Sequence, residues 1–157
     1  MEKRIKKILV AVDFSSYSDA ALAYAFEISQ VLNSQIVAIN IINQKEIDCV
    51  ETAVNACHPG SFVLAKHLSE EMGRRKLKLS ALIKRCPGLE KMSVKILIGY
   101  GIPSVEILEA VDYEQADLLV FGPKGRTNLR GFLFGGVAEK LFRHCPVPVM
   151  SLRSLSE

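Results

Sequence analysis

The sequence predicts an α/β protein: a three-layer sandwich with a five-stranded parallel sheet in the order 3-2-1-4-5 and helices on both faces. Five short apolar runs rich in β-branched residues alternate with segments whose apolar residues follow helical spacing. This alternation is typical of parallel strands joined by right-handed crossovers. At 157 residues, 49% hydrophobic and 24% charged, the chain is expected to form a single domain over residues 1–157.

Each predicted strand is a short apolar run bounded by polar residues, glycine or proline. The five runs are residues 7–12, 36–42, 94–98, 118–121 and 149–152. Continuous valine, isoleucine and leucine without polar alternation indicates burial on both faces of a sheet. The last run follows Pro146 and Pro148, which favours an edge position because proline cannot donate to a ladder.

Helical spacing of apolar residues marks the segments between the strands. The first helix is expected to begin at a serine cap, Ser15 or Ser16, and to end near Asn33. The others are predicted at residues 65–86, 101–111 and 137–142, with Pro103 at the first helical position of the third. Residues 43–60 are polar and aperiodic, so we expect an irregular segment there.

The predicted strand order brings two distant segments together. With the first strand beside the fourth, the winding direction reverses between them, and ligands of open α/β sheets bind at such a point, beyond the carboxyl ends of the strands. Asp13 and Gly122 directly follow these two strands. They are therefore expected on opposite sides of one crevice.

A glycine-rich stretch dominates the last third of the chain. It lies between the strand at residues 118–121 and the helix at residues 137–142, and contains Gly122, Gly125, Gly135 and Gly136. Glycine allows close backbone approach, and the first amides of a helix have no partner inside it. The stretch therefore favours a phosphate-binding loop. The alternative is a tight turn that needs positive φ angles.

Several segments together resemble the universal stress protein family. The family's phosphate motif is Gly-x2-Gly-x9-Gly-(Ser/Thr), and Gly122, Gly125 and Gly135 fit its three glycine positions. Its first strand and aspartate, the turn before its third helix, the lead into its glycine loop and its last strand are similar to residues 7–13, 101–103, 116–120 and 143–149. The resemblance covers nearly the whole chain apart from residues 43–90.

This resemblance implies a Rossmann-like fold, a homodimer and, in one branch of the family, bound ATP or AMP; it leaves open an accompanying Mg²⁺. Carried over, Asp13 would lie at the adenosine, and the backbone around Ile41 would meet the adenine edge. The glycines would approach the ribose and hold the phosphates through backbone amides. The nucleotide-binding residues expected on this basis are Ala11, Val12, Asp13, Ile41, Phe121, Gly122, Gly125, Arg126, Gly135, Gly136 and Val137.

Two positions depart from the family pattern. Gly136 stands where the binding branch has Ser or Thr, so a hydroxyl that would face the phosphates is missing. Pro123 follows the first motif glycine and has no N–H to donate. Arg126, with Lys124 and Arg130, could compensate through positive charge.

Three classes of function remain open. The favoured one is a stress-response regulatory protein that binds an adenine nucleotide. The second is a nucleotide-free dimeric interaction module of the same family, which the two departures would suit. The third is a slow ATPase, although the loop lacks a Walker lysine-serine pair and offers no acidic pair for magnesium beyond Asp13. No catalytic residue is assigned, and an enzyme is the less favoured reading.

Composition and patterning also bear on partners. The net charge of +3 does not indicate nucleic-acid binding, and no apolar stretch approaches the length of a membrane span. The four cysteines have no CxxC spacing, so no metal site is expected and reduced thiols in the cytoplasm are predicted. The apolar edge at residues 147–152, from Val147 to Leu152, would invite aggregation unless paired. We expect antiparallel pairing with the same strand of a second copy.

Overall fold

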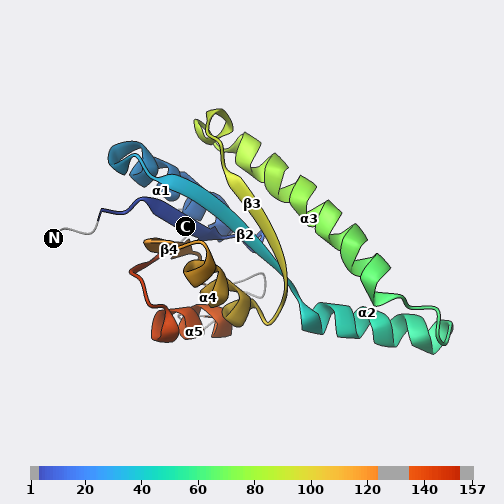
Figure 1. The fold of residues 1–157 in the computed structure, drawn as a ribbon. Helices are drawn as coiled ribbons and strands as arrows, with labels where there is room; N and C mark the ends of the chain where they lie inside the picture. The colour runs from blue at the N-terminus through green and yellow to red at the C-terminus, as the bar shows by residue number, and fades with distance from the viewer. Residues whose placement is uncertain (1–3, 124–134, 153–157) are drawn as a thin grey trace.

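The protein is built on a parallel sheet of five strands in the order β3-β2-β1-β4-β5 (Figure 1). The computed structural model describes residues 4–123 and 135–152. The strands are β1 (Lys7–Ala11), β2 (Gln35–Asn43), β3 (Lys95–Gly101), β4 (Leu118–Phe121) and β5 (Val149–Ser151). The predicted α/β class, with its strand order 3-2-1-4-5, is confirmed.

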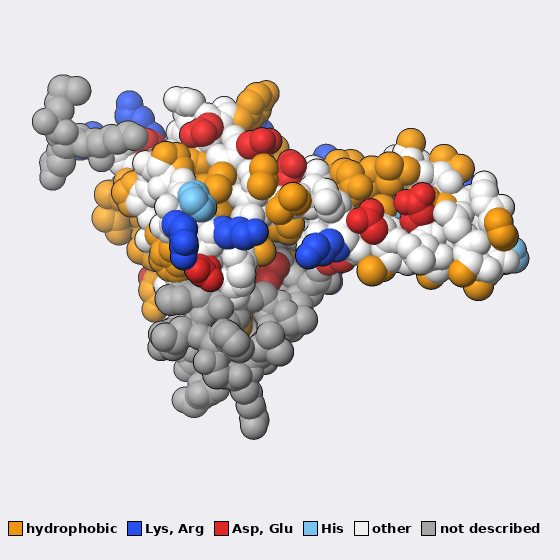
Figure 2. Space-filling view, turned by 90° about the horizontal axis from the view of Figure 1, so that it is seen from below, with side chains coloured by type: hydrophobic (Ala, Val, Ile, Leu, Met, Phe, Trp, Pro, Cys, Tyr) orange, Lys and Arg blue, Asp and Glu red, His pale blue; other side chains and the backbone are white. Residues whose placement is uncertain are grey.

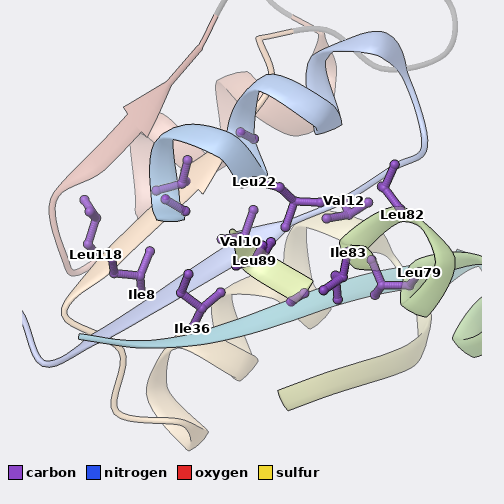
Figure 3. Packing of buried hydrophobic residues seen from close by; sticks show 14 residues of the cluster. Ile8, Val10, Val12, Leu22, Ile36, Leu79, Leu82, Ile83, Leu89 and Leu118 are labelled. Carbon is purple, nitrogen blue, oxygen red and sulfur yellow. The ribbon is translucent and has the colours of Figure 1, made fainter. Parts of the chain in front are cut away.

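Helices cover both faces of this sheet. They are α1 (Ser16–Leu32), α2 (Gln44–Cys57), α3 (Leu64–Arg85), the 3-10 turn η1 (Leu89–Lys91), α4 (Pro103–Tyr113) and α5 (Gly136–His144). Helices α1 and α3 pack with Ile8 and Val10 in one apolar cluster (Figure 3), whereas α4 and α5 pack with Leu9 in a second. Pro103 occupies the start of α4, as predicted.

Strand β1 is the centre of this arrangement. Ile8, Leu9 and Val10 are fully buried, and consecutive side chains enter opposite apolar clusters because side chains alternate across a strand. Ile8 pairs with Ile36 of β2 on one side and with Leu118 of β4 on the other. Since all pairs are parallel, the carboxyl ends of β1, β2 and β4 meet at one edge.

The expectation of an irregular segment at residues 43–60 is wrong, because most of it is helix α2. Its start is fixed locally: the Asn43 side chain caps the helix by accepting a hydrogen bond from the Lys45 amide at 3.1 Å. Ile47 is its buried residue, and Val50, Val54 and Cys57 continue the same helical spacing, so the sequence did carry a signal for this helix. The predicted break at residues 58–60 is present, with Gly60 at a φ of 77°.

Helix α2 and the first turns of α3 form an arm that projects beyond the sheet (Figure 1). In Figure 2 this α2–α3 arm extends away from the body, with hydrophobic side chains scattered among acidic and uncharged ones. The buried residues of α3 are Arg75, Leu79, Leu82 and Ile83. The α2–α3 arm is therefore held to the body by the base of α2 and the second half of α3.

The amino ends of the strands carry an ion cluster around one buried carboxylate. Glu114 has a side chain that is 3% exposed, and its carboxylate lies 2.7 Å from Lys95 Nζ and 3.6 Å from Lys7 Nζ. The hydrogen bond from Lys95, with the charges of both lysines, lowers the pKa of Glu114 below its ordinary value of 4.5. This cluster ties the starts of β1 and β3 to the end of α4.

We expect Glu114→Gln to lower the free energy of unfolding by about 1–3 kcal/mol at pH 7, because a buried charge-assisted contact is lost. Since the folded-state pKa lies below the unfolded one, this contribution is complete above pH 4.5 and disappears as the pH falls through the folded value. Urea unfolding of both proteins between pH 7 and pH 3 measures it. Glu109→Gln, an exposed change on α4, is the control. A difference that stayed constant down to pH 3 would contradict the assignment.

Candidate functional site

A cavity of about 680 Å³ lies at the carboxyl ends of β1, β2 and β4. It is bordered by the starts of α2, α4 and α5, so it occupies the point where the winding of the sheet reverses. Ile39, Ile41, Pro103 and Ile107 form an apolar wall on the β2 side. Glycines form the wall on the β4 side. The volume falls within the range of small-molecule sites, about 300–1,000 Å³.

The structure brings most of the predicted site residues into this cavity. Those that line it are Ala11, Val12, Asp13, Ile41, Phe121, Gly122, Gly135, Gly136 and Val137. The two remaining predictions, Gly125 and Arg126, lie outside the described residues. Segments more than one hundred residues apart in the sequence therefore share one crevice.

Asp13 organises the chain directly after β1. Its Oδ1 accepts hydrogen bonds from the Ser15 amide at 2.9 Å and from Ser18 Oγ at 3.0 Å, and its own amide donates to Ser18 Oγ at 3.1 Å. Ser15 holds the predicted cap position of α1, but its side chain makes no capping bond. The carboxylate of Asp13 thus supports the start of α1 and lines the cavity at the same time.

Helix α5 directs its amino terminus at the β4 side of the cavity. The Gly135 amide donates to the Pro123 carbonyl at 2.9 Å, and the Glu139 amide donates to the Gly135 carbonyl at 3.0 Å. The Gly135 amide, which was expected to hold phosphate, therefore makes its hydrogen bond within the chain. The amides of Gly136, Val137 and Ala138 occupy the first turn, where a helix has no carbonyl to offer them. With the positive end of the helix dipole, these amides suit an anion.

Gly136 leaves room where the family pattern places a hydroxyl. A Cβ built on this residue would meet no heavy atom of the described chain within 4 Å. The residue lines the cavity as the first of helix α5. A serine would therefore fit at this position without displacing its described neighbours.

Four polar residues at the β2 end of the cavity were not predicted: Asn40, Asn43, Glu46 and Arg75. Each had a signal in the sequence. Asn40 interrupts the apolar run of β2, and Arg75 stands on the stripe of α3 that otherwise holds leucine, methionine and isoleucine. Asn43 and Glu46 have the spacing of a helix cap and the third helical position. Because the sequence did not predict how α2 and α3 return to the sheet, these positions could not be assigned to the cavity.

Arg75 is 9% exposed and links three elements. It donates from Nε to Glu71 Oε1 at 2.6 Å, from Nη1 to Asn40 Oδ1 at 3.3 Å and from Nη2 to Glu46 Oε2 at 2.8 Å. Burial opposes its charge, but the hydrogen bonds that Arg75 donates to Glu71 and Glu46, with the charges of both carboxylates, outweigh this and raise the pKa of Arg75. The hydrogen bond from Arg75 lowers the pKa of Glu71. Asn40 is in turn fixed by donating to the Val12 carbonyl at 2.7 Å.

Within residues 4–123 and 135–152, no group of three or more histidine, cysteine, aspartate or glutamate residues is arranged to hold a metal ion. No helix in those ranges is long and apolar enough to cross a bilayer.

A parallel sheet with a glycine-lined crevice at its switch point defines the class of α/β proteins that bind ligands beyond the carboxyl ends of their strands. Residues 4–153 match the model of the universal stress protein family. Universal stress protein MJ0531 of Methanocaldococcus jannaschii is 33% identical over 153 residues, which cover 95% of this chain and 84% of the relative. The chain belongs to the universal stress protein family.

Solved structures agree with this assignment. The structure of protein MJ0577 superposes with a TM-score of 0.76 at 29% identity, covering 98% of this chain and 99% of the other. A universal stress protein in complex with cAMP and one from Archaeoglobus fulgidus in complex with dAMP superpose with TM-scores of 0.64 and 0.60. Each superposition covers 96% of this chain. It covers 98% of the cAMP-bound protein and 99% of the dAMP-bound protein. At 18% and 17% identity, these two show the shared fold.

We expect Asp13→Ala to lower the free energy of unfolding by about 1–3 kcal/mol, because its carboxylate accepts hydrogen bonds from the Ser15 amide and from Ser18 Oγ. Asp13→Asn should cost less, because an amide oxygen can accept the same bonds from Ser15 and Ser18. Urea unfolding of the three proteins without ligand measures both effects. Equal losses in the two variants would show that the charge, rather than the acceptor geometry, supports α1.

Proposed function

We propose that this universal stress protein binds an adenine nucleotide, ATP or AMP, and acts as a regulatory protein of the stress response whose state depends on occupancy. The observation that carries the proposal is the amino terminus of α5 at the switch-point cavity, beside Gly122 and Gly136. Backbone amides at such a terminus suit phosphate groups. The complexes with cAMP and dAMP in proteins of the same fold support an adenine ligand.

The two ends of the cavity differ as a nucleotide requires. The glycine end offers backbone amides and the helix dipole for phosphate. The β2 end offers Ile39, Ile41 and Ile107 for the flat face of a base. The polar residues Asn40, Asn43, Glu46 and Arg75 line the same end of the cavity. Asp13 lies at the end of β1, between them, where a carboxylate can accept from ribose hydroxyl groups.

The two alternative functions have weaker support. A nucleotide-free module would suit Pro123 and Gly136, yet the cavity keeps its first-turn amides despite both residues. A slow ATPase would need groups to hold magnesium and to orient water. Among the described residues, the two carboxylates that line the cavity already have partners: Asp13 accepts hydrogen bonds at the start of α1, and Glu46 accepts one from Arg75. Nucleotide binding without dedicated catalysis therefore fits the described residues best.

The proposal predicts that millimolar ATP or AMP raises the melting temperature of the purified protein, because a ligand that binds the folded state stabilises it. Gly136→Ser should tighten binding about tenfold or more, since a hydrogen bond to a charged group contributes about 1.5–3 kcal/mol. Gly136→Asp should abolish binding by placing a carboxylate beside the phosphates. Isothermal titration calorimetry measures the dissociation constants, and heat denaturation followed by chromatography identifies any nucleotide that co-purifies.

Gly73 supplies the matched control for these two changes. A Cβ at this exposed position on α3 also meets no heavy atom within 4 Å, so Gly73→Ser and Gly73→Asp should leave binding unchanged. They correct for any effect of replacing glycine in a helix. If the wild-type protein and Gly136→Ser both bind no ATP or AMP at millimolar concentration, the nucleotide-free alternative replaces this proposal.

We also propose a homodimer through the last strand. β5 lies at the edge of the sheet and pairs with β4. The Leu119 amide donates to the Pro148 carbonyl, and the Leu152 amide donates to the Phe121 carbonyl. Because backbone groups alternate along a strand, those of Val149 and Ser151 point away from β4. Antiparallel pairing with a second copy over residues 147–152 would satisfy them.

Light scattering at micromolar concentration should therefore give twice the 17.4 kDa mass of one chain. Ser151→Pro removes an outward-pointing donor without touching the bonds to β4, so it should give the monomer mass. Ser151→Thr keeps that donor and should remain dimeric. A wild-type monomer, or a dimer that Ser151→Pro leaves intact, would refute this interface.

A further inference from the structure

A polar cluster lies at the β2 end of the cavity, and β1 separates β2 from β4. Arg75, Asn40 and Glu46 come from three elements, line the cavity and are joined by hydrogen bonds. Asn40 is 2% exposed and Arg75 is 9% exposed. Burying such groups is costly unless each is paired, so the position of each side chain is strongly fixed. The cluster is therefore a pre-formed polar surface rather than a set of mobile charges.

Its place in the sheet assigns it to one end of a nucleotide. β2 is separated from β4 by β1, and neighbouring strands lie about 4.8 Å apart, so the cluster is roughly 10 Å from the glycine wall. With phosphates at the amino terminus of α5, the base reaches the end of β2 and the start of α2. Asn43 and Glu46 border the cavity there.

Glu46 is held as an acceptor at this end. It is the third residue of α2, where the helix dipole favours a negative charge. Arg75 Nη2 binds its Oε2 at 2.8 Å, and 37% of the Glu46 side chain stays exposed. A carboxylate offers about four lone-pair sites, so it can accept a further N–H while it keeps Arg75.

We propose that Glu46 accepts a hydrogen bond from the exocyclic amine of the adenine base, with Arg75 as the residue that positions it. The inference rests on the proposed function, since it takes adenine as the base. The exocyclic amine is the hydrogen-bond donor of adenine, whose ring nitrogens accept. An ionised carboxylate can only accept, so its match on this base is that amine. Glu46 thereby makes the site selective for a purine that carries an amine at position 6.

The test compares ATP with purine riboside triphosphate, which lacks only the 6-amino group. Calorimetry gives both dissociation constants for the wild-type protein and for Glu46→Ala. The wild type should prefer ATP by about tenfold or more, since hydrogen bonds to charged groups are the strong ones. In Glu46→Ala the preference should fall to about twofold or less, through weaker ATP binding. Glu51→Ala, at an exposed glutamate of the same helix, should keep the wild-type preference.

Arg75→Met tests the positioning role. It should reduce the preference for ATP over the deaminated analogue while affinity for the analogue stays within about twofold, because Arg75 acts through Glu46. A purely structural role would weaken both ligands equally. All titrations are run well below the melting temperature of each variant.

The outcomes separate the two proposals. If the wild-type protein binds neither ligand, the proposed nucleotide function fails and takes this inference with it. If ATP binds but Glu46→Ala keeps the full preference, Glu46 does not contact the amine and this inference alone is overturned. A wild-type protein that binds both ligands equally would also overturn it.

Discussion

The pairing of β1 with both β2 and β4 determines most of this structure. Ile8, Leu9 and Val10 are fully buried and supply both apolar clusters, so β1 cannot be moved to an edge without exposing them. Placing β1 between β2 and β4 forces the winding to reverse beside it. The end of β1, the start of α5 and the end of β2 then converge on one cavity. The strand order therefore creates the cavity, and particular side chains then determine its lining.

The two ends of the strands carry two different clusters of charged residues. At the amino ends of the strands, Glu114 is closed in by Lys7 and Lys95, which leaves a compact cluster that joins strand starts to α4. At the carboxyl ends, Arg75 is also buried, but it lines the cavity together with its partners Asn40 and Glu46. Buried ion clusters contribute little net stability compared with apolar packing. Here one cluster fixes the positions of the strand starts, and the other fixes the position of a cavity wall.

The strand order and many of the residues that line the cavity followed from the sequence, because parallel strands have continuous apolar runs and glycines mark close backbone approach. Helix α2 was not predicted, although Ile47, Val50 and Val54 have helical spacing and the Asn43 side chain caps its start. The positions of Glu46 and Arg75 at the cavity were not predicted either, because they depend on how α2 and α3 return to the sheet. The bond from the Gly135 amide to the Pro123 carbonyl was also not predicted. Local patterns could not supply these long-range placements.

The open space around Gly136 has an evolutionary consequence. Where this glycine is encoded by GGT or GGC, one base change produces serine, and the described structure needs no compensating change to accept it. If the proposed nucleotide site is correct, a lineage could gain or lose a hydroxyl beside the phosphates in a single mutational step. Ligand affinity in such a protein can follow selection quickly, while the sheet that supports the site stays unchanged.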